Sequence, residues 1–182
     1  MANEYLVRTP TSTGNRKVFT WAAWIKTAEI TNPNALLGVY HGGSSRYILL
    51  RIQNNILNFF AGNFTTGSTT TYNTWVDTVQ KFRDAGNWMH LTLVYNTADS
   101  SSQERLKIYL NGVDVPVSIT NSPGLNSQSY FNSQYPHYIG TWADSANNGS
   151  QYYDGELSDI FLVDGQALTP DVFGFYKEGK GY

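Results

Sequence analysis

Short apolar and aromatic runs alternate along the chain with clusters of Gly, Asn, Ser and Pro. Runs rich in Val, Ile, Tyr, Phe, Trp and Thr between such turn residues are typical of β-strands. Helical periodicity is nearly absent, so the strands are expected to form a sandwich or a barrel. The predicted strands lie near residues 4–8, 18–26, 35–41, 46–52, 55–61, 69–77, 88–96, 104–110, 113–119, 136–142 and 153–163.

Two turns and one helix are predicted between and after these strands. Asn111-Gly112 separates two apolar runs, and this dipeptide readily takes the positive φ angles of a type I′ hairpin turn. Residues 53–55 are expected to form a similar turn. Near the C-terminal end, Thr169 can cap a short helix that begins at Pro170, where Asp171 suits the positive end of the dipole.

Two apolar runs differ in the expected burial of their faces. Residues 19–25 are apolar on both alternations, as expected of a central strand that is covered on both sides. Residues 88–95 have one clearly apolar face and one mixed face. The large rings of Trp21, Trp24 and Trp88 are assigned to the core.

The composition restricts the function more than the fold. A length of 182 residues suits a single domain over residues 1–182. The net charge of −2 is spread without the basic patch that nucleic acid or anionic lipid would require. The absence of cysteine excludes disulfides and thiolate metal sites. No export signal or apolar span of ~18 residues is evident, so we expect a soluble protein without nucleic-acid or membrane partners.

No catalytic residue is predicted. A glucanase-type site needs carboxylates on alternate positions of one strand. The nearest pair, Glu156 and Asp159, is three positions apart, a spacing that sends side chains to opposite faces. His41, His90 and His137 have no nucleophile at a recognised spacing, and His90 is interpreted as structural. Binding is therefore favoured over catalysis.

No cofactor is expected, although the sequence contains candidate ligands for calcium. A calcium site needs about six or more oxygen ligands. The turn at residues 144–150 and the following Asp154 supply only two carboxylates. The candidate ligands are Asp144, Asn148 and Asp154, and the alternative is an ordinary turn rich in Asp and Asn.

Aromatic residues in two long polar segments, 118–136 and 142–153, are the remaining candidates for function. Loops longer than a hairpin needs are uncommon unless they bind something or pack locally. Rings among Ser, Asn and Gln are typical of surfaces where adaptable polar groups surround rigid anchors. The alternative is that the rings only cover the open end of the fold. The predicted binding or assembly surface consists of Tyr130, Phe131, Tyr135, Trp142 and Tyr152.

Several segments form a recognisable set when taken in order: 19–26 (FTWAAWIK), 88–95 (WMHLTLVY), 106–112 (LKIYLNG), 153–160 (YDGELSDI) and 164–170 (DGQALTP). Together they resemble the laminin-G-like branch of the concanavalin A-like lectin/glucanase superfamily. This resemblance implies an all-β fold, a two-sheet antiparallel sandwich of the jelly-roll type. In the wider family such domains bind glycans or proteins, some with a calcium ion, and the glucanase branch hydrolyses polysaccharides.

Three shorter segments more narrowly resemble versions of this domain in structural proteins of tailed bacteriophages. They are 5–10 (YLVRTP), 14–17 (GNRK) and 165–170 (GQALTP). This resemblance implies a non-enzymatic virion protein, used in capsid decoration, a fibre or the tail. Such a protein would contact copies of itself, other virion proteins and host-surface glycans. The alternatives are a free carbohydrate-binding lectin module and, third, a glycoside hydrolase of the glucanase branch.

Overall fold

The computed structural model describes residues 4–40, 47–63, 71–83, 85–145 and 148–174, which form two antiparallel sheets. One has the order β1 (Leu6–Arg8), β11 (His137–Ile139), β3 (Asn34–Tyr40), β4 (Tyr47–Gln53), β5 (Ile56–Asn63), β6 (Thr71–Thr78) and β10 (Val117–Asn121). The other has the order β14 (Gly155–Asp164), β2 (Val18–Thr27), β7 (Met89–Asn96), β8 (Leu106–Leu110) and β9 (Val113–Asp114). A hairpin of β12 (Trp142–Ser145) and β13 (Asn148–Ser150) lies beside β3.

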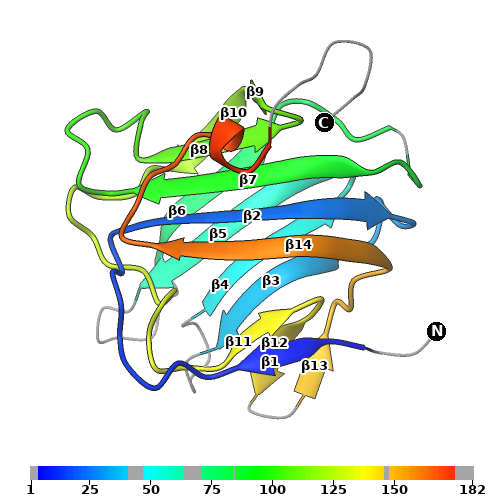
Figure 1. Cartoon of the computed structure of the whole chain (residues 1–182), viewed down its shortest axis with the longest axis horizontal. Helices are drawn as coiled ribbons and strands as arrows, with labels where there is room; N and C mark the ends of the chain where they lie inside the picture. Colours follow the sequence, from blue (N-terminus) through cyan, green and yellow to red (C-terminus); the bar gives the residue numbers. More distant parts are fainter. Residues whose placement is uncertain (1–3, 41–46, 64–70, 84, 146–147, 175–182) are drawn as a thin grey trace.

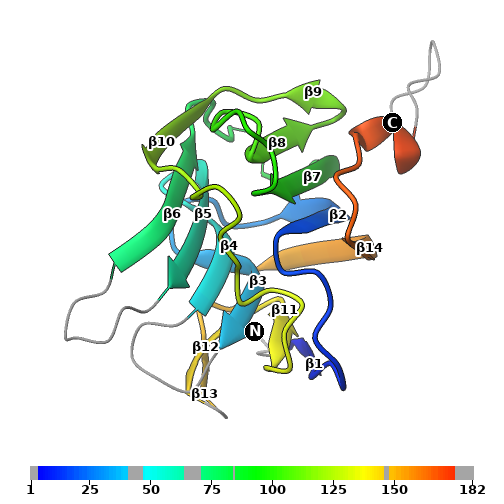
Figure 2. The ribbon, with the colours of Figure 1, turned by 90° about the vertical axis from the view of Figure 1, so that its left-hand side faces the viewer.

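The two sheets stack face to face, which confirms the expected antiparallel sandwich. Figure 1 looks onto the five-stranded sheet, with the seven-stranded sheet behind it, and Figure 2 shows the two layers from the side. Alternate side chains of both sheets fill the space between them. In β2, Phe19 and Trp21 point into this core, and the Phe19 ring stacks on that of Tyr95 at 5.0 Å between centroids.

The outer face of β2 is also covered, as its apolar sequence predicts. Thr20 and Ala22 lie on this face, and neither is exposed. The chain that follows β14 crosses over Thr20, whose hydroxyl donates to the Gln166 carbonyl at 2.8 Å and accepts from the Leu168 N–H at 2.9 Å. This C-terminal segment therefore covers part of the outer face of the five-stranded sheet, near the start of β2.

Both predicted hairpin turns are confirmed. Asn111 and Gly112 have φ angles of 49° and 79° and join β8 to β9. Asn54 and Asn55, at 53° and 66°, join β4 to β5. Positive φ angles at both central residues are those of a type I′ turn, which matches the twist of the flanking strands.

Two predicted segments are divided differently in the structure. Residues 113–119 separate around Pro116 into β9 and β10, which belong to different sheets. Proline has no N–H to donate to a sheet, so it favours a break at this point. Part of the 142–153 segment, which is expected to be a loop, forms the β12–β13 hairpin.

The predicted C-terminal helix is a single 3-10 turn, Pro170–Val172, so the prediction of a helix is wrong. The N–H groups of Val172 and Phe173 donate to carbonyls three residues back, at 3.2 and 3.0 Å. Thr169 does not cap the turn, because its hydroxyl donates to the Asp171 carboxylate. Across the described residues, no helix is long and apolar enough to cross a membrane.

The three tryptophans assigned to the core lie in different environments. Trp21 is 1% exposed and packs between the sheets. Trp24 is three positions further along β2, so it lies on the outer face, where it is half-buried with its ring 5.3 Å from that of His90. Trp88 immediately precedes β7 and is 43% exposed. The core assignment is therefore right for Trp21 and wrong for Trp24 and Trp88.

The segment between β10 and β11 packs inward. Phe131 is 1% exposed, and its ring stacks on Phe19 at 4.5 Å between centroids. The Asn132 N–H donates to Nε2 of His137 at 2.9 Å, so Nδ1 carries the proton and donates to the Tyr135 carbonyl at 2.7 Å. Burial lowers the pKa of His137. The neutral ring therefore holds this segment against the core.

We expect Trp21→Ala to lower the free energy of unfolding by ~3–5 kcal/mol, because it removes a large ring from a packed core. Trp88→Ala is the matched control and should lower it by less than about 1 kcal/mol, because most exposed positions tolerate substitution. Chemical denaturation of the two variants and the wild type measures both values. Equal losses in the two variants would contradict the burial described above.

We expect stability to fall as the pH is lowered from about 7.5 to about 5.5. Burial holds the pKa of folded His137 below its ordinary value of 6.5, so the unfolded chain binds the proton more readily. The contribution of His137 is present above the unfolded pKa and is lost below it, by at most about 1.4 kcal/mol per pH unit. Denaturation at several pH values should show a smaller dependence in His137→Asn than in the wild type. Identical dependence in both proteins would exclude this role.

Candidate functional site

An open groove lies between the free edges of the two sheets. β14 is one edge of the five-stranded sheet and β1 is one edge of the seven-stranded sheet. Figure 1 shows these two strands on the same side of the sandwich. Side chains from both strands, β11 and the 152–154 segment enclose a hollow of about 570 Å³. We call it the tyrosine groove, and its lining includes Glu4, Tyr5, Leu6, Ile139, Tyr152, Tyr153, Asp154, Leu157 and Ile160.

Hydrogen bonds hold the 152–154 segment at the end of the groove. The Tyr153 N–H donates to the Gly140 carbonyl at 2.8 Å, and the Asp154 N–H donates to the side-chain oxygen of buried Asn34 at 2.7 Å. Gly140 has a φ of 82°, a conformation that favours glycine. A Cβ at Gly155 would lie 2.1 Å from a backbone oxygen of β2. The backbone therefore fixes where the side chains of this segment enter the groove.

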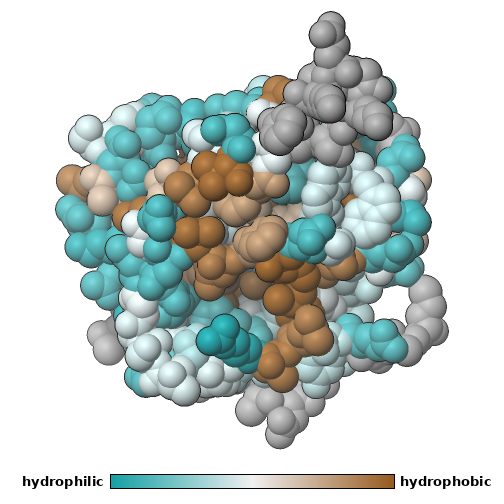
Figure 3. Space-filling model, viewed as in Figure 1, coloured by the Kyte–Doolittle hydropathy of each residue, from teal (hydrophilic) through white to brown (hydrophobic). Residues whose placement is uncertain are grey.

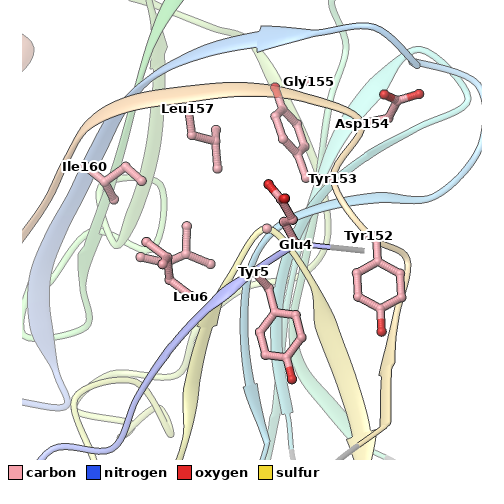
Figure 4. Close-up of a pocket in the computed structure, with 11 residues that line it drawn as sticks. Glu4, Tyr5, Leu6, Tyr152, Tyr153, Asp154, Gly155, Leu157 and Ile160 are labelled. Carbon is pink, nitrogen blue, oxygen red and sulfur yellow. The ribbon is translucent and has the colours of Figure 1, made fainter. Parts of the chain in front are cut away.

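The groove has an aromatic side and an aliphatic side. Tyr5 is 44% exposed, and its ring centroid lies 6.3 Å from that of Tyr152, with 42° between the ring planes. Figure 4 shows Leu6, Leu157 and Ile160 across the hollow from these rings. A ligand in the groove would therefore meet ring surface on one side and aliphatic surface on the other.

The two acidic residues of the lining are oriented differently. In Figure 4 the Glu4 carboxylate points into the hollow, whereas the Asp154 carboxylate points away from it. Burial raises the pKa of Tyr153, and its hydroxyl oxygen is buried, so it does not face a ligand in the groove. The polar groups that a ligand can reach include the phenols of Tyr5 and Tyr152 and the carboxylate of Glu4, a set suited to a polyhydroxylated ligand.

A second aromatic cluster covers the outer face of the seven-stranded sheet. Here Trp75 and Trp142 pack against a buried cluster that contains Phe60, and the Arg51 guanidinium lies 5.0 Å from the Phe60 ring centroid. The Trp75 indole N–H donates to Asp77 at 3.0 Å. Arg51 also donates to other side chains of this face. Because these groups already bond to one another, the cluster primarily fixes the β12–β13 hairpin on the sheet.

The structure does not bring the five predicted surface residues together. Tyr152 lines the tyrosine groove, whereas Trp142 packs on the outer face of the seven-stranded sheet. The rings of Tyr130 and Tyr135 meet edge to face at 6.2 Å and pack partly against the core. Phe131 is buried in the core and is not a surface residue, because its ring fills one end of the sandwich.

The structure describes the side chain of one of the three candidate calcium ligands. Asp154 lies in the tyrosine groove. The side chains of Asp144 and Asn148 lie outside the described residues, as does His41. Among the residues that are described, no group of three or more His, Cys, Asp or Glu side chains could hold a metal ion. Calcium binding stays a prediction.

The two carboxylates considered for glucanase chemistry lie outside the groove. Glu156 forms an ion pair with Lys26 at 2.7 Å. A β-bulge between Ser158 and Phe161 interrupts the alternation of β14, and Asp159 within it has a φ of 47°. Asp159 therefore lines a hollow on the outer face together with Ser158. The prediction that Glu156 and Asp159 lie on opposite faces is wrong, because it assumes an unbroken strand.

The sequence analysis missed the N-terminal half of the groove. Glu4, Tyr5 and Leu6 reach the groove only because β1 joins the far edge of the seven-stranded sheet. No local pattern connects them with residues 152–160, which lie near the other end of the chain. The signal that the sequence offers for this half of the groove is the short apolar run at residues 5–7. The structure leaves its side chains exposed, Leu6 at 65% and Val7 at 55%.

Solved structures of several proteins are similar to this chain. A heptameric SAP-like pentraxin from Limulus polyphemus is 17% identical over 87% of this chain and 68% of its own, with a TM-score of 0.56. Domains LG4-5 of the mouse laminin alpha1 chain are 19% identical over 93% of this chain and 41% of their own, with a TM-score of 0.61. The CBM40 of Ruminococcus gnavus IT-sialidase, bound to alpha2,3 sialyllactose, is 14% identical over 94% of this chain and 97% of its own, with a TM-score of 0.59. At these identities the likeness shows the fold alone.

A match to a protein family extends over nearly the whole chain. The family described as the concanavalin A-like lectin/glucanases superfamily matches residues 2–172, which include both strands that border the tyrosine groove. A comparison with curated proteins finds no match. Fold and family match agree, and the chain belongs to the concanavalin A-like lectin/glucanases superfamily as a laminin-G-like domain.

Proposed function

We propose that this chain is a non-enzymatic glycan-binding domain that holds sugar in the tyrosine groove. The observation that carries the proposal is the pairing of Tyr5 and Tyr152 in one hollow with the carboxylate of Glu4. The C–H face of a sugar ring packs on an aromatic ring, and its hydroxyls bond to carboxylates and phenols. At about 570 Å³ the hollow is of ordinary size for a small-ligand site, ~300–1,000 Å³.

Several proteins that are similar to this chain bind sugars or are described as carbohydrate-binding, which supports the proposal. The description of the family names lectins and glucanases, and one similar structure contains alpha2,3 sialyllactose. A second similar structure is described as a putative carbohydrate binding protein from Bacteroides ovatus, with 18% identity and a TM-score of 0.57. Function does not follow from fold, so the side chains of the groove carry the argument.

Binding without hydrolysis is the form of the proposal that the carboxylates favour. Glycoside hydrolysis generally uses two carboxyl groups that flank the scissile bond, about 5 to 9.5 Å apart. Glu156 and Asp159 lie outside the tyrosine groove, and Glu156 is paired with Lys26. In Figure 4 the Glu4 carboxylate points into the hollow, where it can accept hydrogen bonds from sugar hydroxyls, whereas the Asp154 carboxylate points away from it.

A structural or adhesion role in a phage-like virion is a second proposal. The narrower sequence resemblance favours it, and so does an apolar surface on the face shown in Figure 3, over β14 and β1. Apolar patches of this kind often mark contacts with another protein, here a second copy or another virion component. The exposed side chains are Leu6 at 65%, Val7 at 55%, Phe161 at 47% and Leu162 at 43%.

Tyr152→Ala should weaken glycan binding by at least about tenfold, which corresponds to about 1.4 kcal/mol, because it removes one of two paired rings. Tyr130→Ala removes a ring from a distant aromatic pair and is the matched control. A glycan array identifies ligands of the wild type, and calorimetry with a retained glycan compares the variants. The wild type should release no reducing sugar from that glycan. Hydrolysis, or equal binding by Tyr152→Ala, would overturn the proposal.

For the virion role, we expect the wild type to form a homo-oligomer that Val7→Asp disperses. A charge at this 55% exposed position would be desolvated in an apolar contact. Native mass spectrometry over a range of concentrations measures the assembly. A protein that stays monomeric at every concentration would argue against self-assembly through this surface.

A further inference from the structure

The outer face of the five-stranded sheet carries a second aromatic hollow, away from the tyrosine groove. It is shallow, with a volume of about 340 Å³, and its four lining residues come from three adjacent strands. Trp24 belongs to β2, Trp88 immediately precedes β7, and the other two lie in the bulge of β14. We call it the indole hollow, and its residues are Trp24, Trp88, Ser158 and Asp159.

The indole rings of this hollow are not part of the core. Trp88 is 43% exposed, an unusual position for the largest apolar side chain. Trp24 is half-buried, and the edge contact of its ring with His90 at 5.3 Å and 62° fixes its orientation. Ring surface that is held in place and open to solvent is typical of a binding platform.

The β-bulge explains how a carboxylate reaches these rings. In an unbroken strand, Asp159 would point to the opposite face from Ser158, toward the core. The extra residue of the bulge turns Asp159 outward instead, with a φ of 47° that is uncommon for residues other than glycine. The Ser158 hydroxyl donates to the Asp159 carboxylate at 3.1 Å and orients it. Bulges that redirect a side chain are frequent beside binding sites.

The charges around the hollow distinguish between two kinds of ligand. The Lys26 ammonium lies 6.0 Å from the Trp88 ring centroid and is paired with Glu156. A protein cation therefore already occupies the neighbourhood of this ring, which disfavours an ammonium ligand. A neutral sugar ring suits the hollow better, because it can stack on the exposed indole and direct hydroxyls to Asp159 and Lys26.

We propose that the indole hollow is a second sugar-binding site, in which a pyranose ring stacks on Trp88 and hydrogen-bonds to Asp159. The shallow shape suits one ring of a longer glycan chain at a surface. The choice of sugar as the ligand rests on the proposed function. The site itself shares no residue with the tyrosine groove, so each can bind without the other.

The test compares six proteins on one array of neutral and sialylated oligosaccharides: wild type, Trp88→Ala, Tyr152→Ala, the double variant of these two, Asp159→Asn and Phe161→Ala. Trp88→Ala should lower retention of at least one glycan by about tenfold or more. Asp159→Asn, which keeps the shape of the side chain, should lower retention of the same glycan. Phe161→Ala removes an aromatic ring that is 47% exposed on the same sheet but outside the hollow, and it should have no effect.

Fluorescence gives a second readout that does not depend on multivalent binding. Addition of the retained oligosaccharide should change the tryptophan emission of the wild type, and this change should disappear in Trp88→Ala. Unaltered retention and emission response in a folded Trp88→Ala protein would overturn the second site. If only Tyr152→Ala loses binding, the tyrosine groove is supported as a binding site and the indole hollow is excluded. If only Trp88→Ala loses binding, the indole hollow is supported and the tyrosine groove is excluded. No retained glycan at all would overturn both proposals.

Discussion

The burial of β2 on both faces is the constraint on which the rest of the structure depends. Its inner side chains, Phe19 and Trp21, fill the core, its outer Thr20 bonds to the C-terminal segment, and its outer Ala22 is fully buried. A strand covered in this way must also be paired on both sides, and β14 and β7 provide that pairing. β14 then becomes an edge of its sheet. Its free side borders the tyrosine groove.

The two proposed sites use the two faces of β14. Leu157 and Ile160 point into the tyrosine groove, whereas Ser158 and Asp159 line the indole hollow. The bulge makes this division possible, because it inserts one residue between the two sets. One edge strand therefore supplies an aliphatic wall to one surface and a carboxylate to the other.

The sequence predicts most strands and both hairpins because their signals are local. Asn111-Gly112 is an example, since the dipeptide itself determines the turn. The core assignment of Trp24 failed because residues 19–25 are apolar on both alternations, so the pattern does not say which face is inner. Phe131 lies in a polar segment, and only the packing of distant strands shows that it is buried. The groove depends on sheet order, which no local pattern encodes.

The most direct test of glycan binding is an NMR titration that follows the tyrosine ring resonances. The ligand is an oligosaccharide that the wild-type protein retains on an array. The account predicts that the rings of Tyr5 and Tyr152 shift in a saturable way, while those of Tyr130 and Tyr135 do not. Shifts confined to the Tyr130–Tyr135 pair, or no saturable shift in the groove with any retained glycan, would contradict it.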